Sequence, residues 1–240
     1  MNKLCIIRQP AGIGDIFFCQ KIARQIIDKL GYKVLWPILP HLLFIKDYIK
    51  YTNLEFCNYE SAFSYKKEFN DTNIRNIIAV STDDILVPLH GHTTCDDSIM
   101  ISKYKFINLD WKDWSNYFTF ERNYNKEKAL FYDVLQLTDN SKYNFVNTYF
   151  ATPPHEQKVN ITTSNNLQNV NLVITADFNV FDWCKVLENA TNIYTAETCF
   201  NFILEKLKLK AETMTMYSKW KPPDFHHIDK LFTKKWVYVK

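Results

Sequence analysis

Short apolar runs alternate along the chain with longer amphipathic segments, which is the pattern of strands followed by helices. The first apolar run, 4–7, reads as a buried strand, and a helical pattern extends from Asp15 to about Leu30. Four further strands are predicted at 33–36, 54–57, 77–80 and 85–89, and a helix at 41–51. Alternation of this kind favours a parallel sheet with helices on its faces.

A second series of the same kind begins after the middle of the chain. Its predicted strands are 144–150, 172–175, 193–195 and 212–217, and its predicted helices are 127–137, 181–189 and 197–209. We therefore expect an α/β fold of two Rossmann-like parallel-sheet halves facing a cleft. The halves are 1–120 and 121–218, and 219–240 is expected to be a returning helix and tail. Ligands of such sheets bind at the carboxyl ends of the strands, and a cleft between two halves is the expected site.

Composition indicates a folded protein with a substantial core. Apolar residues make up 47% of the 240 residues and charged residues 23%, which argues against disorder. The six cysteines include no CxxC pair, as is usual for reduced, buried thiols. No stretch reaches the roughly 18 consecutive apolar residues of a membrane span, and the N-terminus runs directly into the first strand. These features predict a cytoplasmic protein.

The charge is small overall but unevenly distributed. A formal net charge of +3 is too low to indicate nucleic acid as a partner. Residues 203–240 hold nine lysines against four acidic residues, whereas 1–202 hold 20 basic and 22 acidic residues. The basic C-terminal part is either a solvated lysine-rich surface or a place that favours phosphates or a membrane surface. A membrane contact is therefore possible but not indicated.

Two of the four glycines lie close together in sequence, a few residues after the first predicted strand. Gly12 and Gly14 allow backbone angles that other residues resist, and Asp15 opens the helix that follows. A strand, a glycine turn and a helix N-terminus bring backbone N–H groups together around an anion or a polar ligand. The Asp15 carboxylate is then either a helix cap or a base directed at a ligand.

A second helix is predicted to start directly after the strand at 193–195, with an acid and a hydroxyl in its first turn. Glu197, Thr198 and Cys199 form this start. Side chains of this kind commonly cap a helix N-terminus. The functional alternative is that Glu197 accepts hydrogen bonds from ribose or sugar hydroxyls, while the N–H groups near Thr198 and Cys199 hold a diphosphate.

Together these two segments resemble GT-B-type glycosyltransferases, most closely the heptosyltransferase-like group. That group begins with a strand, a Gly-Asp turn and a long helix, and carries an acidic-Thr-Gly element that opens a helix near the C-terminus. Glu197 and Thr198 look like this element, with Cys199 in place of its glycine. The resemblance implies a nucleotide-sugar donor held mostly by the C-terminal half, Asp15 as the base that deprotonates the acceptor hydroxyl, inversion, and no metal.

Glycosyl transfer also needs positive charge near the departing nucleoside diphosphate. Arg8 and Arg122 are the best candidates, because a guanidinium fork suits phosphate better than a lysine does. The simpler interpretation of each is a surface arginine that pairs with a nearby glutamate. Lys219 is a weaker diphosphate candidate.

Histidine supplies an alternative base. His90 ends the predicted strand at 85–89, at the edge where ligands are expected, and could act as a base or contact the acceptor. His90, His92, Cys95, Asp96 and Asp97 superficially suggest metal ligands, yet they lack any established zinc spacing. We therefore expect neither a metal nor another cofactor. The aromatic residues of 111–120 either line a sugar-stacking surface or belong to a core.

The leading hypothesis is a metal-independent glycosyltransferase whose partners are a nucleotide sugar and a glycan or other hydroxyl acceptor. The alternative is a non-catalytic nucleotide- or glycan-binding module of the same fold. Another Rossmann-type enzyme is a third option, but the first turn lacks the full G-x-G-x-x-G spacing, because Phe17 stands three residues after Gly14. A mononucleotide kinase is disfavoured by the lack of a G-x-x-x-x-G-K-[ST] motif.

Overall fold

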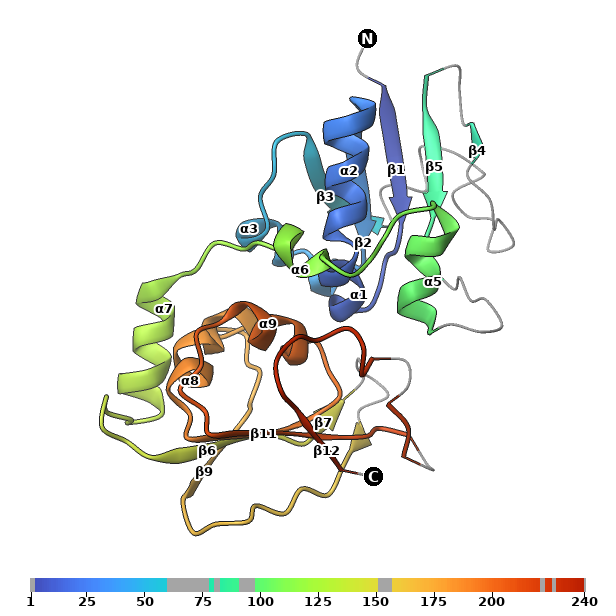
Figure 1. Cartoon of the computed structure of the whole chain (residues 1–240). Coiled ribbons are helices and arrows are strands. Elements are labelled where there is room, and N and C mark those ends of the chain that lie inside the picture. Colours follow the sequence, from blue (N-terminus) through green and yellow to red (C-terminus); the bar gives the residue numbers. More distant parts are fainter. Residues whose placement is uncertain are drawn as a thin grey trace. The chain divides into compact units, whose positions relative to one another are not determined.

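A computed structural model describes most of the chain and divides it into two compact units (Figure 1). The described residues are 3–59, 78–79, 83–90, 98–150, 157–220, 223–225 and 228–239. Unit 1 comprises Met1–Glu121 and unit 2 comprises Arg122–Lys240. Each unit is built around one five-stranded sheet, so the predicted α/β class with two parallel-sheet halves is confirmed.

The sheet of unit 1 has the strand order β3-β2-β1-β5-β4. Its strands are β1 (Leu4–Arg8), β2 (Lys33–Ile38), β3 (Leu54–Asn58), β4 (Ile78–Ala79) and β5 (Ile85–Pro88). All pairs are parallel except β4 with β5, which is antiparallel. β1 lies in the middle of this sheet, so the segment that follows it starts from the central strand.

The described helices of unit 1 lie mainly after β1 and β5 (Figure 1). They are α1 (Ile13–Phe18), α2 (Gln20–Leu30), a 3₁₀ turn (Pro40–Leu42), α3 (Ile45–Tyr48), α5 (Ile99–Phe106) and α6 (Trp114–Tyr117). Gly31 closes α2 in a left-handed conformation with φ 72° and donates its N–H to the carbonyl of Ile27. The helix expected at 41–51 is shorter, because Ile49 is extended and ends α3.

Aromatic side chains fill the core beneath α1 and α6. The ring of Phe17 stacks on that of Phe118 with centroids 4.5 Å apart, and Phe18 packs edge-on against Tyr104 at 4.8 Å. Trp114 is 1% exposed and also packs against Phe18. Of the two interpretations of the aromatic segment 111–120, the structure therefore places Trp114 and Phe118 in the core of unit 1.

The main sheet of unit 2 is parallel throughout, with the order β12-β11-β10-β6-β9. Its strands are β6 (Tyr143–Asn147), β9 (Gln168–Asn171), β10 (Asn192–Ala196), β11 (Thr213–Tyr217) and β12 (Val237–Val239). Two further strands, β7 (Tyr149–Phe150) and β8 (Gln157–Lys158), form a separate antiparallel sheet of their own. The strand expected at 144–150 is thus divided into β6 and β7.

Two expectations for unit 2 are wrong. The strand expected at 172–175 is β9, four residues earlier, and Val173 and Ile174 are 59% and 50% exposed. For 219–240 we expected a returning helix and tail. In the described part of that segment the chain instead returns as strand β12, which pairs with β11 from Thr215↔Val237 to Tyr217↔Val239. The β-branched residues of Val237–Val239 favour this strand.

The helical segments of unit 2 are short. They are α7 (Tyr124–Lys128), a π-helical turn (Ala129–Val134), a 3₁₀ turn (Val180–Trp183), α8 (Cys184–Asn189) and α9 (Phe200–Lys206). Asn179 and Asp182 form a capping box at the 3₁₀ turn before α8. In the part of the chain that the structure describes, no helix combines the length and apolar character needed to span a bilayer.

Candidate active site

Two of the predicted residues of unit 1, Arg8 and His90, lie next to each other where β1 and β5 end. The carbonyl oxygen of Arg8 accepts the N–H groups of Leu89, at 3.1 Å, and of His90, at 2.8 Å. The chain segments before the Gly12 turn and at His90 therefore lie side by side. His90 is exposed, whereas the Arg8 residue is only 3% exposed. His90 is thus open to a ligand, and the buried Arg8 side chain offers a ligand little surface.

The glycine turn holds Asp15 in a close-fitting position. Gly12 has φ 81°, a left-handed conformation that favours glycine. A Cβ atom at Gly12 would overlap Oδ2 of Asp15 and lie 3.1 Å from its Cγ. A residue with a Cβ atom at position 12 would therefore have a strained backbone angle and would require the Asp15 side chain to shift. Gly14, by contrast, lies within α1.

This dual requirement gives a prediction for unit 1. Replacing Gly12 by alanine should lower the free energy of unfolding by about 3 kcal/mol, because backbone strain and the overlap with Asp15 act together. Gly31→Ala is the matched control: Gly31 also has a positive φ, 72°, but nothing lies within 4 Å of the position that a Cβ atom would occupy there. The control should lose about 1 kcal/mol in urea unfolding. Equal losses for the two variants would contradict the overlap with Asp15.

A buried lysine that the sequence did not point to completes this site. Lys103 on α5 has a side chain 1% exposed, and its Nζ lies 2.7 Å from Oδ1 of Asp15, whose side chain is 28% exposed. Lys103 also donates a hydrogen bond to Oε1 of Gln9. Asp15 therefore forms an ion pair with a residue far from it in sequence, and part of the Asp15 side chain remains exposed.

A cysteine lies in the same electrostatic environment. Burial raises the pKa of the Cys19 thiol to about 12, with Lys103 lowering it and Asp15 raising it by smaller amounts. A thiol with this pKa carries almost no thiolate at neutral pH. Cys19 therefore acts as an apolar neighbour of the site and not as a nucleophile.

In unit 2, Glu197 and Lys219 meet at the ends of β10 and β11. The Glu197 N–H donates to the carbonyl of Tyr217 at 3.2 Å, and Lys219 Nζ lies 2.9 Å from Glu197 Oε1. The Glu197 residue is 7% exposed and the Lys219 side chain 32%. The two predicted donor-binding residues thus form an ion pair with each other, and the lysine remains accessible.

Thr198 belongs to a network of buried amides. Its Oγ1 accepts a hydrogen bond from Nδ2 of Asn147 at 3.1 Å, and its N–H donates to Oδ1 of Asn201 at 2.7 Å. Asn147 and Asn201 are each 1% exposed and were not predicted. Their signal in the sequence is weak, because buried asparagines next to apolar residues resemble solvent-facing positions of a strand or helix.

The predicted helix start at Glu197 is displaced. α9 begins at Phe200 and has seven residues, with Cys199 as its N-cap. Burial raises the pKa of the Cys199 thiol to about 12. Cys199 therefore stands at the helix start as a protonated thiol, one position before the first helical residue.

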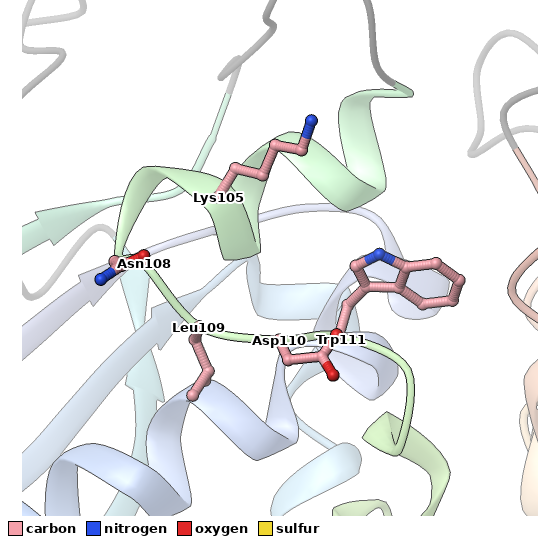
Figure 2. Close-up of a pocket in the computed structure, with 5 residues that line it drawn as sticks. All are labelled: Lys105, Asn108, Leu109, Asp110 and Trp111. Atoms are coloured by element: carbon pink, nitrogen blue, oxygen red, sulfur yellow. The ribbon is translucent and has the colours of Figure 1, made fainter.

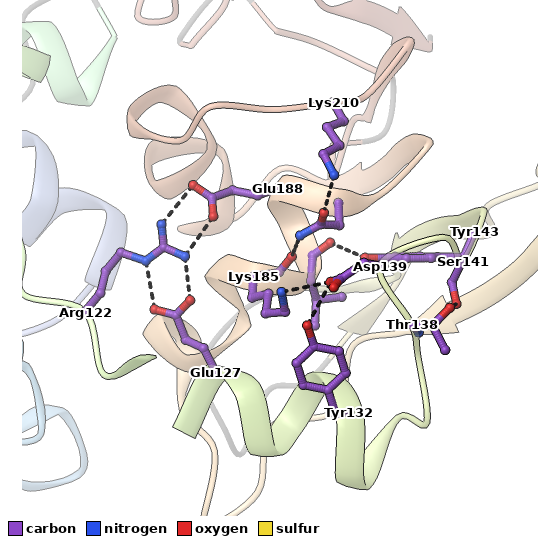
Figure 3. Close-up of polar contacts among 12 residues, drawn as sticks. Arg122, Glu127, Tyr132, Thr138, Asp139, Ser141, Tyr143, Lys185, Glu188 and Lys210 are labelled. Atoms are coloured by element: carbon purple, nitrogen blue, oxygen red, sulfur yellow. Dashed lines mark hydrogen bonds and ion pairs between the residues drawn. The ribbon is translucent and has the colours of Figure 1, made fainter. Parts of the chain in front are cut away.

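The structure places the Arg122 guanidinium between two glutamates. Its guanidinium donates two hydrogen bonds to Glu127, of 2.5 and 2.8 Å, and two to Glu188, each of 2.8 Å (Figure 3). Hydrogen bonding to Glu127 and then to Glu188 raises the pKa of Arg122 above its ordinary value. One cation between two carboxylates carries a net charge of −1, which repels a diphosphate. Arg122 is thus paired with carboxylates, as in the simpler interpretation of this arginine.

The described parts of the molecule hold no cluster of metal ligands, and a hollow lies beside the end of α5. Among the residues the structure describes, no three His, Cys, Asp or Glu side chains are grouped so as to hold a metal ion. His92, Cys95, Asp96 and Asp97 lie outside the described residues. A hollow of about 490 Å³ follows α5 (Figure 2), lined by Lys105, Asn108, Leu109, Asp110 and Trp111. None of the predicted site residues lines it.

Comparisons with known proteins show that the fold of this chain is similar to that of several solved structures. No protein-family model matches the chain, and no curated protein matches it. The glycosyl transferase family 9 structure from Veillonella parvula is similar over 100% of this chain and 87% of that one, with a TM-score of 0.59 and 9% identity. The iron-containing dodecameric heptosyltransferase TibC in complex with ADP-D-beta-D-heptose is similar over 100% of this chain and 63% of TibC, with a TM-score of 0.51 and 8% identity.

A second TibC structure, from enterotoxigenic E. coli H10407, matches with a TM-score of 0.51 and 7% identity over 99% of this chain and 64% of that one. This chain therefore spans less than two thirds of the length of TibC. At such low identity the similarity concerns the backbone arrangement. The chain has the α/β fold found in these glycosyltransferases.

Proposed function

We propose that this protein is a GT-B-type glycosyltransferase that moves a sugar from a nucleoside-diphosphate sugar to an acceptor hydroxyl, without a metal and with inversion. Unit 1 would bind the acceptor, a glycan or another hydroxyl compound, and unit 2 the donor. The fold supports this class, since all three structures compared above are glycosyltransferases. Fold likeness does not define an activity, so the proposal depends on the site.

The observation that carries the proposal is the setting of Asp15. A general base must present its oxygen to the hydroxyl that it deprotonates and must keep a fixed orientation. Asp15 follows the central strand β1, at the edge where parallel sheets bind ligands. Its side chain is 28% exposed, and Lys103 and the close fit with Gly12 fix its position. His90, exposed beside Arg8, is the alternative base.

The donor side of the proposal rests on unit 2. Glu197 and Lys219 lie at the ends of β10 and β11, where a carboxylate can accept hydrogen bonds from sugar hydroxyls and an ammonium can contact a diphosphate. The amides of Asn147 and Asn201 hold Thr198 next to them. Because two glutamates already pair with Arg122, Lys219 is the main cation that we assign to the leaving group, and its side chain is 32% exposed.

The test is a thermal-shift screen against UDP, GDP, ADP, CMP and dTDP, each with Mg²⁺ or with EDTA. A ligand at 100 times its Kd stabilises the folded state by about 2.7 kcal/mol and should raise the melting temperature by a few degrees. We expect one nucleoside diphosphate to do so equally in Mg²⁺ and EDTA. The corresponding sugar nucleotide should then be hydrolysed slowly, or its sugar transferred. No shift with any of the five would contradict the proposal.

A second candidate, a non-catalytic nucleotide- or glycan-binding module, is favoured by one observation. The predicted cation Arg122 is enclosed by Glu127 and Glu188, and Glu197 is paired with Lys219. Unit 2 thus has less uncompensated positive charge than a site for a departing diphosphate would use. Stabilisation by a nucleoside diphosphate, with neither hydrolysis nor transfer of its sugar, would identify this second function.

A further inference from the structure

Among the described residues of unit 1, two lysine side chains are buried, and each has a carboxylate partner. Lys103 on α5 pairs with Asp15, and Lys21 on α2 pairs with Asp113. Their side chains are 1% and 6% exposed. Because burying a charged group costs free energy unless it is paired and hydrogen-bonded, both pairs contribute to the structure of the unit. Only the pair with Lys103 includes the residue that we propose as the base.

The Lys103 ammonium is itself held by a fixed acceptor. The indole N–H of Trp36 donates to the carbonyl of Gln9 at 3.0 Å, in the core of the unit. Gln9 Nε2 donates to the carbonyl of Ala11 at 2.6 Å, just before the glycine turn. Gln9 Oε1 accepts from Lys103, which in turn contacts Asp15. Gln9 thus connects the backbone of the turn to the cation that holds the Asp15 carboxylate.

The exposed fractions of the Lys103 and Asp15 side chains limit how Lys103 can affect a reaction. A side chain that is 1% exposed cannot contact an acceptor, whereas Asp15 is 28% exposed and can. Any effect of Lys103 on a reaction must therefore act through the groups that it contacts, and of these Asp15 is the one that we propose as the base. The Gly12 turn limits the carboxylate on one side, since it leaves no space for a Cβ atom, and Lys103 attracts Oδ1 on another.

We propose that Lys103, supported by Gln9, is a positioning residue that sets the orientation of the Asp15 carboxylate for deprotonation of the acceptor hydroxyl. This inference rests on the proposed glycosyl transfer and adds a residue to its mechanism. The acceptor O–H bond breaks and its proton passes to Asp15. The acceptor oxygen then bonds to the anomeric carbon, and the nucleoside diphosphate leaves with the electron pair of the broken bond. An error of about 1 Å in the position of such a base can lower the rate about 10²-fold.

Lys21 provides a matched control variant. Its Nζ contacts the carbonyl of Asp110 at 2.5 Å and the carboxylate of Asp113, so Lys21→Met also removes a buried cation from unit 1. Both of these contacts are made to the segment 110–113, and neither involves Asp15. A loss of activity that comes only from a weakened fold should appear in both lysine variants, whereas a loss from a misplaced base should appear only in Lys103→Met.

The experiment measures kcat and both KM values for the wild-type protein, Lys103→Met and Lys21→Met, well below the lowest melting temperature. We expect Lys103→Met to lower kcat about 30- to 100-fold and to leave the donor KM within about twofold. Lys21→Met should keep kcat within about threefold. Lys103→Arg, which keeps the charge, should recover at least part of the lost kcat. Equal losses in the two methionine variants, or a loss confined to the donor KM, would overturn the proposal.

A double-mutant cycle tests whether Lys103 acts through Asp15. In an Asp15→Asn background, Lys103→Met should change the residual rate by less than about threefold, because the base is already lost. A full additional loss would show that Lys103 acts by another route. Should Lys103→Met fail to fold, Gln9→Leu takes its place: it leaves the ion pair but removes the fixed acceptor, and an unchanged kcat in that variant would refute the inference. Absence of transfer by the wild-type protein would instead refute the proposed function.

Discussion

Asp15→Asn is expected to lower the rate of sugar transfer about 10³-fold while leaving the affinity for the nucleoside diphosphate within about twofold. A positioned general base typically contributes 10²- to 10⁴-fold, and an amide cannot accept the proton. Asparagine has nearly the shape of aspartate, so it fits against Gly12 and its amide oxygen can still accept a hydrogen bond from Lys103. The donor is assigned to unit 2, so its binding should be insensitive to this change.

The measurement is kcat with saturating donor, together with the Kd of the nucleoside diphosphate and the melting temperature. Asp113→Asn is the control, because Asp113 is the carboxylate partner of the other buried lysine, Lys21. Both variants remove the negative partner of a buried ammonium and should destabilise unit 1 by similar amounts. A large fall in kcat for Asp15→Asn alone supports the base. Comparable falls in both would mark Asp15 as a structural residue, and His90 would become the candidate to test.

The strands and the glycine turn could be predicted because their signals are local. Apolar runs such as 4–7 mark buried parallel strands, and the pair Gly12 and Gly14 followed by Asp15 marks a strand–turn–helix connection. The same reasoning found β10, β11 and the segment with Glu197 that follows β10. The sequence signals for these strands and for the place of Asp15 after the turn therefore lie within a few residues of one another.

β9 was missed because its stabilisation is not local. Gln168–Asn171 is polar, but Asn169 Oδ1 accepts a hydrogen bond from Asn144 on β6 at 2.9 Å, and Asn144 Oδ1 accepts one from Asn192 on β10 at 3.0 Å. This row of amides satisfies polar side chains within the sheet. The apolar residues Val173 and Ile174, which suggested a strand, are exposed just beyond it.

The partners of the site residues could not be predicted for the same reason. Lys103 lies 88 positions after Asp15, in a segment where no feature marks it as buried or paired. Glu188 lies 66 positions after Arg122, so the sequence left open whether this arginine meets a carboxylate or a phosphate. The sequence indicated which side chains could act as a base or bind a ligand. Only the tertiary contacts show which of their charges the protein neutralises itself.

Arg122→Met is expected to destabilise unit 2 by about 3–5 kcal/mol, the largest loss of stability that we predict. The variant leaves the Glu127 carboxylate, 1% exposed, without its bidentate cation, and leaves Glu188, 23% exposed, without the same partner. Removing one member of a buried ion pair costs this much, because the remaining charge stays away from water and uncompensated. If Arg122 instead served a bound diphosphate, its removal from the ligand-free protein would change stability little.

Hydrogen exchange on peptides of each unit, combined with urea unfolding, measures this loss and locates it. Protection should fall in α7 and α8, which carry Glu127 and Glu188, and stay unchanged in unit 1. Lys50→Met is the control, because its ion pair with Glu121 joins side chains 58% and 62% exposed and should contribute under 1 kcal/mol. Adding Glu127→Gln to Arg122→Met should recover much of the lost stability, since the glutamine leaves no buried charge. A loss that persists in the double variant would mean that Arg122 stabilises unit 2 through packing and not through its charge.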